Sequence, residues 1–86
     1  MEFVNAQEQH KKYPNTFSIP SDEELNNVKV DDFVKVCLNS ERFWIKVVNI
    51  TGDDIIGEVS NCLLFNDLEL GEKLTVKKYN ILSITN

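Results

Sequence analysis

The chain has 86 residues, of which 42% are hydrophobic and 27% are charged, and this length and composition predict one globular domain over residues 1–86. Nine Lys and Arg against fourteen Asp and Glu give a net charge of −5. This balance disfavours polymeric nucleic acid and anionic membranes as partners, because both are bound through basic surfaces. The longest apolar run, Cys62–Phe65, is far shorter than the roughly 20 residues that span a bilayer, and no signal peptide is visible. We therefore expect a cytoplasmic protein, in the host cytoplasm if its origin is viral.

The cysteine and histidine content argues against a metal site. Cys37 and Cys62 each sit in an apolar stretch, which in a reducing compartment predicts two buried thiols and no disulfide. With His10 as the single histidine, the chain lacks the usual four ligands of a structural zinc ion. We expect no metal and no cofactor.

The first third of the chain, residues 1–31, is predicted to be helical in part. Apolar residues at helical spacing indicate a short amphipathic helix within 1–12, and the segment 17–19 alternates and is expected to be extended. Ser21 with Glu24 three residues later forms the capping-box signature, which predicts a helix of one to two turns over 22–27.

Residues 32–86 have the pattern of a β-sheet, because branched side chains alternate with polar ones between turn signals. The expected strands are 33–38, 42–50, 55–59, 74–77 and 81–84. The connections are too short for parallel crossovers, so the sheet must be antiparallel. Gly57 inside the third strand indicates a bulge or a sharp bend. The predicted fold is α+β and mainly β: a five-stranded antiparallel curled sheet or a small SH3-like barrel, with one or two short N-terminal helices.

Catalytic constellations are not evident. His10 has no predicted neighbour among the cysteines or serines, and the paired acids Asp31-Asp32 and Asp53-Asp54 occupy strand entries or turns, where Asp is a common turn residue. We therefore expect a protein that is not an enzyme.

One strand carries a more specific pattern. Arg42 and Trp44 are the only Arg and the only Trp of the chain, and Lys46 follows at the same spacing. If the alternating apolar residues pack inward, these three side chains project together from the other face. They could hold a planar anionic ligand, by stacking on the ring and pairing with the cations. Alternatively, Trp44 covers one end of the core and the cations pair with Glu58 across the hairpin.

Several short segments carry a family pattern: 32–36 (DFVKV), 41–47 (ERFWIKV), 57–61 (GEVSN), 70–74 (LGEKL) and 80–81 (NI), with 16–20 (TFSIP) as a lead-in. Together they resemble a bacterial family known as a domain of unknown function, the YegJ-like group. Asp31 stands where the family usually has Gly, and Glu72 where it usually has Asp. The resemblance supports the fold and implies no known activity, cofactor or catalytic residue. Similar small domains occur in phage and bacterial conflict loci.

Two hypotheses for function follow. The first is a non-catalytic binding module, in a bacterial or phage conflict setting, that binds a protein partner or a small ligand through the face of Arg42, Trp44 and Lys46 and nearby Asn61. The second is a viral anti-defence protein that sequesters a nucleotide second messenger without cleaving it. In that case the base stacks on Trp44 or Phe65, and the cations hold the phosphates at a junction between subunits of a homo-oligomer.

Overall fold

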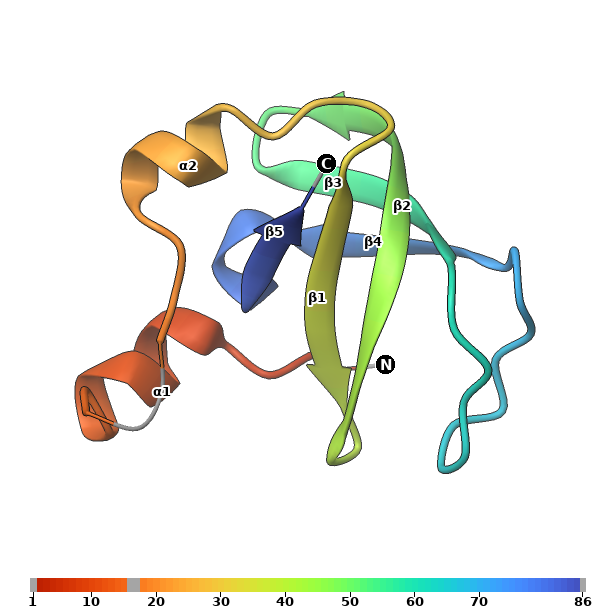
Figure 1. Ribbon diagram of the computed structural model, residues 1–86, viewed down its shortest axis with the longest axis horizontal. Coiled ribbons are helices and arrows are strands. Elements are labelled where there is room, and N and C mark those ends of the chain that lie inside the picture. Colours follow the sequence, from red (N-terminus) through yellow and green to blue (C-terminus); the bar gives the residue numbers. More distant parts are fainter. Residues whose placement is uncertain (1, 16–17, 86) are drawn as a thin grey trace.

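The computed structural model describes residues 2–15 and 18–85 as two short helices, a five-stranded sheet and one 3₁₀ turn (Figure 1). In chain order these are α1 (Ala6–Lys12), α2 (Asp22–Asn26), β1 (Phe33–Leu38), β2 (Glu41–Thr51), β3 (Asp54–Val59), β4 (Lys73–Lys77), η1 (Lys78–Asn80) and β5 (Ser83–Thr85). Thr16 and Phe17 lie outside the described residues, and Phe17 is the first residue of the predicted extended segment 17–19. In the described part of the chain no helix has the length and apolar character needed to cross a membrane.

Both predicted helices form, and α1 is shorter than predicted. It begins only at Ala6, because the side chain of Asn5 caps the helix by accepting a hydrogen bond from the Glu8 backbone N–H. Phe3, which has helical spacing to Ala6 and His10 in the sequence, lies outside α1 and forms an isolated antiparallel bridge with Leu38. The capping box of α2 is present as predicted, and α2 ends at Asn26.

The five strands form one antiparallel sheet in the order β4-β3-β2-β1-β5. The sheet is curled, but β4 and β5 remain its two edges. Of the two predicted arrangements, the structure therefore has the open curled sheet and not the closed barrel. Figure 1 shows both helices on one side of the molecule and the long connection between β3 and β4 on the opposite side.

Two tight turns fix the register of β2 against its neighbours. Asn39 and Ser40, both at positive φ, form the two-residue loop between β1 and β2, as expected for a turn of the I′ type. Gly52 has φ of 59° and begins the two-residue loop between β2 and β3. Because both loops contain only two residues, they set which side chains lie opposite one another across the hairpins.

The predicted irregularity near Gly57 lies in the partner strand. The register of β2 against β3 shifts between Val47 and Asn49, next to Gly57. Gly57 itself permits a close approach, since a Cβ there would lie 2.8 Å from Cδ1 of Ile45 and 3.0 Å from the carbonyl oxygen of Lys46. A glycine is therefore required at this position by contact with the neighbouring strand.

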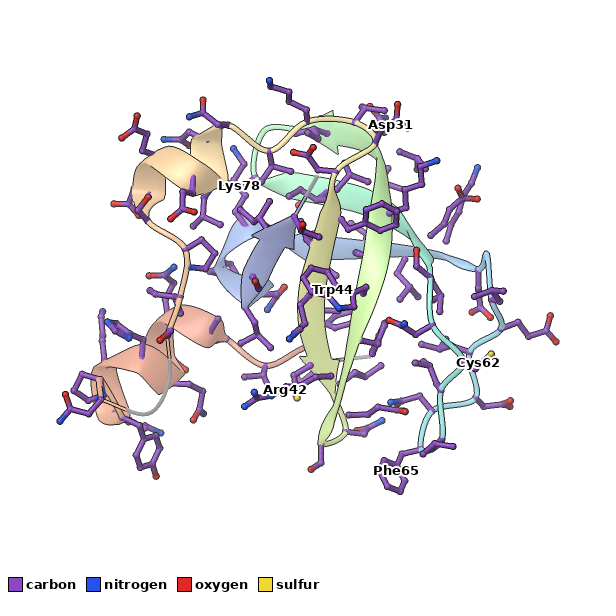
Figure 2. The ribbon with its side chains drawn as sticks, in the orientation of Figure 1. Asp31, Arg42, Trp44, Cys62, Phe65 and Lys78 are labelled. Atoms are coloured by element: carbon purple, nitrogen blue, oxygen red, sulfur yellow. The ribbon has the colours of Figure 1, made fainter. Side chains whose placement is uncertain are left out.

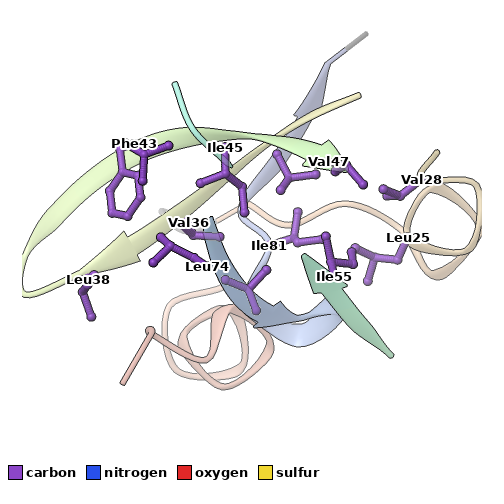
Figure 3. Close-up of a cluster of buried hydrophobic side chains, with 13 residues drawn as sticks. Leu25, Val28, Val36, Leu38, Phe43, Ile45, Val47, Ile55, Leu74 and Ile81 are labelled. Atoms are coloured by element: carbon purple, nitrogen blue, oxygen red, sulfur yellow. The ribbon is translucent and has the colours of Figure 1, made fainter. Parts of the chain in front are cut away.

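The core fills the inner, concave face of the sheet (Figure 3). Its buried residues are Leu25, Val28, Val34, Val36, Leu38, Phe43, Ile45, Val47, Ile55, Val59, Leu74, Val76 and Ile81. Leu38 and Phe43 lie at one end of this cluster, and Leu25 and Val28 from α2 and the segment after it lie at the other. The predicted inward direction of alternate residues in β1 and β2 is confirmed.

Candidate functional site

Strand β2 presents the three side chains that the sequence singled out. Burial alternates along β2 from Arg42 to Val47, and Arg42, Trp44 and Lys46 take the positions that point away from the core. The arrangement follows from the two-residue periodicity of a strand whose other face is buried. Figure 2 places Arg42 and Trp44 along the β1–β2 hairpin.

Strand β1 adds three side chains to the same surface. Residues directly opposite each other in an antiparallel pair point to the same side of the sheet. The outward pairs of β1 and β2 are Phe33 with Lys46, Lys35 with Trp44, and Cys37 with Arg42. Each pair combines one cation with an aromatic ring or a thiol. We call these six residues the Trp44 face.

The indole of Trp44 has a cation as its neighbour. The Nζ atom of Lys35 lies over the ring, 5.1 Å from its centroid. At a partly exposed position such a cation–π contact contributes about 0.5–1 kcal/mol, and it holds both side chains in one orientation. Trp44 is half-buried, so it is neither a core residue nor a freely exposed one. Lys35 occupies one face of the ring.

Lys46 lies among acidic neighbours. Its Nζ is 3.7 Å from Oδ1 of Asp31, and both side chains are largely exposed, so solvent screens this ion pair. Glu58 of β3 is directly opposite Lys46, as expected for a neighbour across the hairpin. Two carboxylates therefore border the Trp44 face at Lys46: Asp31, just before β1, and Glu58 of β3.

Asn61 is linked to the face through the backbone of Trp44. Its side-chain Oδ1 accepts a hydrogen bond of 2.6 Å from the Trp44 N–H, and the Ser60 N–H donates to the Trp44 carbonyl at 3.0 Å. Asn61 thus extends the β2–β3 ladder by one side-chain bond just past the end of β3. The observed contact is structural, since it holds the backbone of Trp44.

Phe65 lies apart from the other predicted site residues. It is 73% exposed and belongs to the connection between β3 and β4. Figure 2 shows Phe65 well separated from Trp44, on the other side of the hairpin end from Arg42. Within one copy of the chain, Arg42, Trp44 and Lys46 therefore lie on one surface, and Phe65 is not part of it.

Glu41, which was not predicted as a site residue, fixes the segment that carries Phe65. Its carboxylate accepts hydrogen bonds from the backbone N–H groups of Leu64 at 2.6 Å and Phe65 at 3.0 Å, and from Nδ2 of Asn66 at 3.1 Å. The same Asn66 amide donates to the carbonyl of Leu38 at 2.9 Å. A single carboxylate at the end of the β1–β2 hairpin thus determines where the loop tip lies.

The hydrogen bonds to the Glu41 carboxylate lower its pKa. The hydrogen bond from the Leu64 N–H, supported by those from Phe65 and Asn66, lowers the pKa of the Glu41 carboxyl below its ordinary value of 4.5. The ionised form is therefore the one that holds the loop. It persists at neutral pH and is lost only when the pH falls through that lowered pKa.

The prediction of two buried thiols is wrong, since neither cysteine is buried. Both are free; Cys37 is half-buried on the Trp44 face, whereas Cys62 is exposed. Cys62 follows β3 in irregular chain, where an apolar sequence run does not ensure burial. Among residues 2–15 and 18–85, no group of three or more His, Cys, Asp or Glu side chains is placed to hold a metal ion.

Four of the surface hollows in the described part of the molecule are lined by residues outside the Trp44 face. Two of these four have volumes of about 500 and 450 Å³. The first lies between α2 and β5 and is lined in part by Asp32, and the second lies where α1, α2 and η1 meet and is lined in part by Tyr79. The Trp44 face belongs instead to the outer surface of a curled sheet.

Lys35 and Phe33 complete the face, and the sequence did contain a signal for them. The alternation in β1 that buries Val34 sends Phe33 and Lys35 outward, and the two-residue loop at Asn39 and Ser40 sets Lys35 opposite Trp44. Glu41 had no such signal, because its partners lie more than 20 residues away in a loop without periodicity.

Comparison of the chain with protein-family models, with curated proteins and with solved structures finds no match. The resemblance to the YegJ-like group therefore stays a prediction.

Proposed function

We propose that this protein is a non-catalytic binding module that binds an acidic surface of a protein partner through the Trp44 face. The observation that carries the proposal is the set of three cross-strand pairs, each of which joins a cation to an aromatic ring or a thiol on one outward surface. Three of the nine Lys and Arg residues lie on this face of a chain whose net charge is −5. Local charge of this kind steers partners of the opposite sign and selects among them.

The shape of the face supports a protein partner in preference to a small ligand. Small-molecule sites are concave and enclose most of their ligand, whereas the Trp44 face is on the outer side of a curled sheet. Trp and Arg are also the side chains that most often dominate the energy of protein interfaces. Lys35 already covers one face of the indole, where the base of a sequestered nucleotide would stack. A role in bacterial or phage conflict, suggested by the resemblance, is part of this proposal.

A random peptide library displayed on phage provides the probe for a test. Selection on the wild-type protein should enrich peptides that carry acidic and apolar residues, and calorimetry then gives the affinity of one synthetic peptide. Trp44→Ala should weaken its binding by at least about tenfold, as for an interface hot spot. Thr75→Ala, an exposed position on β4, is the matched control and should bind as the wild type does.

Two results would contradict the proposal. One is a failure of the peptide test: either the enriched peptides carry no acidic residues, or the affinity of the selected peptide is the same for Trp44→Ala as for the wild type. The other is a rise of the melting temperature with one member of a panel of cyclic and linear nucleotides, abolished by Trp44→Ala, with the nucleotide recovered intact. That second result would favour sequestration of a nucleotide.

A further inference from the structure

The connection between β3 and β4, residues 60–72, exposes apolar side chains at its tip and near its end. Leu64 is 87% exposed, Phe65 is 73% exposed and Leu70 is 65% exposed, whereas Leu63 and Leu68 from the same segment pack against the core. We call residues 60–72 the Phe65 loop. Exposed apolar side chains that are grouped in one segment are typical of an interaction site.

The Phe65 loop has the opposite charge to the Trp44 face. It contains Asp67, Glu69 and Glu72 and no Lys or Arg. The Trp44 face contains three cations, together with the half-buried rings of Phe33 and Trp44. The two surfaces are therefore opposite in charge, although Asp31 and Glu58 adjoin Lys46, and both have an apolar centre.

The Phe65 loop is also ordered before any partner arrives. Glu41 binds its tip, as described above, and Gly71 and Glu72 connect its end to Val59 through backbone hydrogen bonds of 2.8 and 2.9 Å. Binding through a loop that is already held in place loses less conformational entropy than binding through a flexible one. This favours association even through a small surface.

We propose that the Phe65 loop of one copy of this chain docks on the Trp44 face of a second copy, so that the protein self-associates. Within one copy Ser60 and Asn61, at the start of the loop, bond to the Trp44 backbone, but Phe65 itself lies well away from Trp44 (Figure 2), so the Phe65 side chain meets a Trp44 face only between copies. The inference rests on the proposed function, because it names the acidic surface that the Trp44 face binds. It uses different surfaces of the two copies, and such contacts close into a ring or continue as an open chain.

The size of the contact sets the expected strength. A standard interface buries about 800 Å² on each partner. That amount is a large share of the 5539 Å² total surface of this chain, and a single loop covers less. We therefore expect weak association, visible by analytical ultracentrifugation between about 10 µM and 1 mM and reduced at high salt.

Charge reversal tests the pairing directly. The face variant carries Lys35→Glu and Arg42→Glu, and the loop variant carries Asp67→Lys and Glu69→Lys. Each variant alone should sediment as a monomer of about 9.9 kDa. An equimolar mixture should associate again, because the reversed charges are complementary. Native-like circular dichroism and thermal unfolding of each variant establish that it is folded.

A second variant keeps the test decisive if a charge-reversed chain fails to fold. Phe65→Ser removes an exposed ring and should abolish association without changing stability. Tyr13→Ser, at an exposed aromatic residue (56%) at the end of α1, is the matched control and should associate like the wild type. A wild-type protein that stays monomeric up to about 1 mM, or association that survives Phe65→Ser, would overturn the inference.

The failure of this inference is distinguishable from the failure of the proposed function. If the wild type is monomeric but the selected acidic peptide still binds and depends on Trp44, self-association is refuted and the binding face stands. If peptide binding is also indifferent to Trp44, both are refuted.

Discussion

Gly57→Ala should destabilise the protein through a contact that the structure defines closely. The new Cβ would lie 2.8 Å from Cδ1 and 3.0 Å from Cγ1 of Ile45, and 3.0 Å from the carbonyl oxygen of Lys46. Real Cβ contacts are longer than this, so β2 and β3 must separate or the Ile45 side chain must leave its position. The Lys46 carbonyl belongs to β2, which pairs with β1 on one side and β3 on the other, so it cannot move without weakening the hydrogen bonds between these strands.

The magnitude follows from two opposing effects. Overpacking a core costs about 1–3 kcal/mol. Alanine also restricts the unfolded chain, which recovers about 0.4–1 kcal/mol. The net loss in the free energy of unfolding is therefore about 1–2 kcal/mol. With a urea m-value of about 1 kcal/mol/M for a chain of this size, the midpoint should fall by about 1–2 M.

A double mutant isolates the contact. Ile45→Val removes Cδ1, the atom closest to the new Cβ, and alone costs about 0.5–1.5 kcal/mol. In Gly57→Ala/Ile45→Val the loss of unfolding free energy should be smaller than the sum of the losses in the two single mutants, as expected for residues in contact. A Gly57→Ala protein as stable as the wild type, or strict additivity in the double mutant, would refute the reasoning.

Three further predictions concern single residues. Asn80 is buried; its side chain accepts a hydrogen bond from the Lys77 N–H at 2.9 Å and donates one to the Val4 carbonyl at 3.0 Å. Asn80→Ala should therefore lower the free energy of unfolding, measured in urea, by about 1–3 kcal/mol. An unchanged urea midpoint would contradict this role. Asp31 has φ of 79°, a region that disfavours a Cβ, so Asp31→Gly should raise the free energy of unfolding by about 0.5–1 kcal/mol; a loss would show that the side chain of Asp31 matters more than its backbone. Glu41 has a lowered pKa, so its hold on the Phe65 loop is complete above its unfolded-state pKa and is lost as the pH falls through the folded value below 4.5. The amide NMR signals of the Phe65 loop should accordingly shift in acid, and in Glu41→Gln they should already be shifted at neutral pH. Loop signals that change under neither condition would show that Glu41 does not hold the loop.

The sequence was sufficient for the elements whose pattern is local. Alternation from Val34 to Val47 determined which residues fill the core, and the capping box at Ser21 determined the start of α2. The outward position of Arg42 and Trp44 follows from the same periodicity. Each of these features depends on residues within a few positions of one another, where propensity and spacing act directly.

Features that depend on distant parts of the chain were not predictable in this way. Whether the sheet closes depends on how β4 and β5 are placed at its two edges, and no local pattern encodes that. The apolar run Cys62–Phe65 led to the prediction of a buried Cys62, but irregular chain has no period, and of these four residues only Leu63 packs against the core. The role of Glu41 required knowledge of where the Phe65 loop returns to the hairpin.

The affinity of the library-selected acidic peptide for Trp44→Ala, measured beside the urea stability of the same variant, tests the binding face most directly. We predict a loss of at least about tenfold in affinity with a loss of no more than about 1–2 kcal/mol in the free energy of unfolding, since the ring is half-buried outside the core and Lys35 lies over it. Unchanged affinity together with a large loss of stability would mean that Trp44 is a structural residue and that the Trp44 face is not a binding surface.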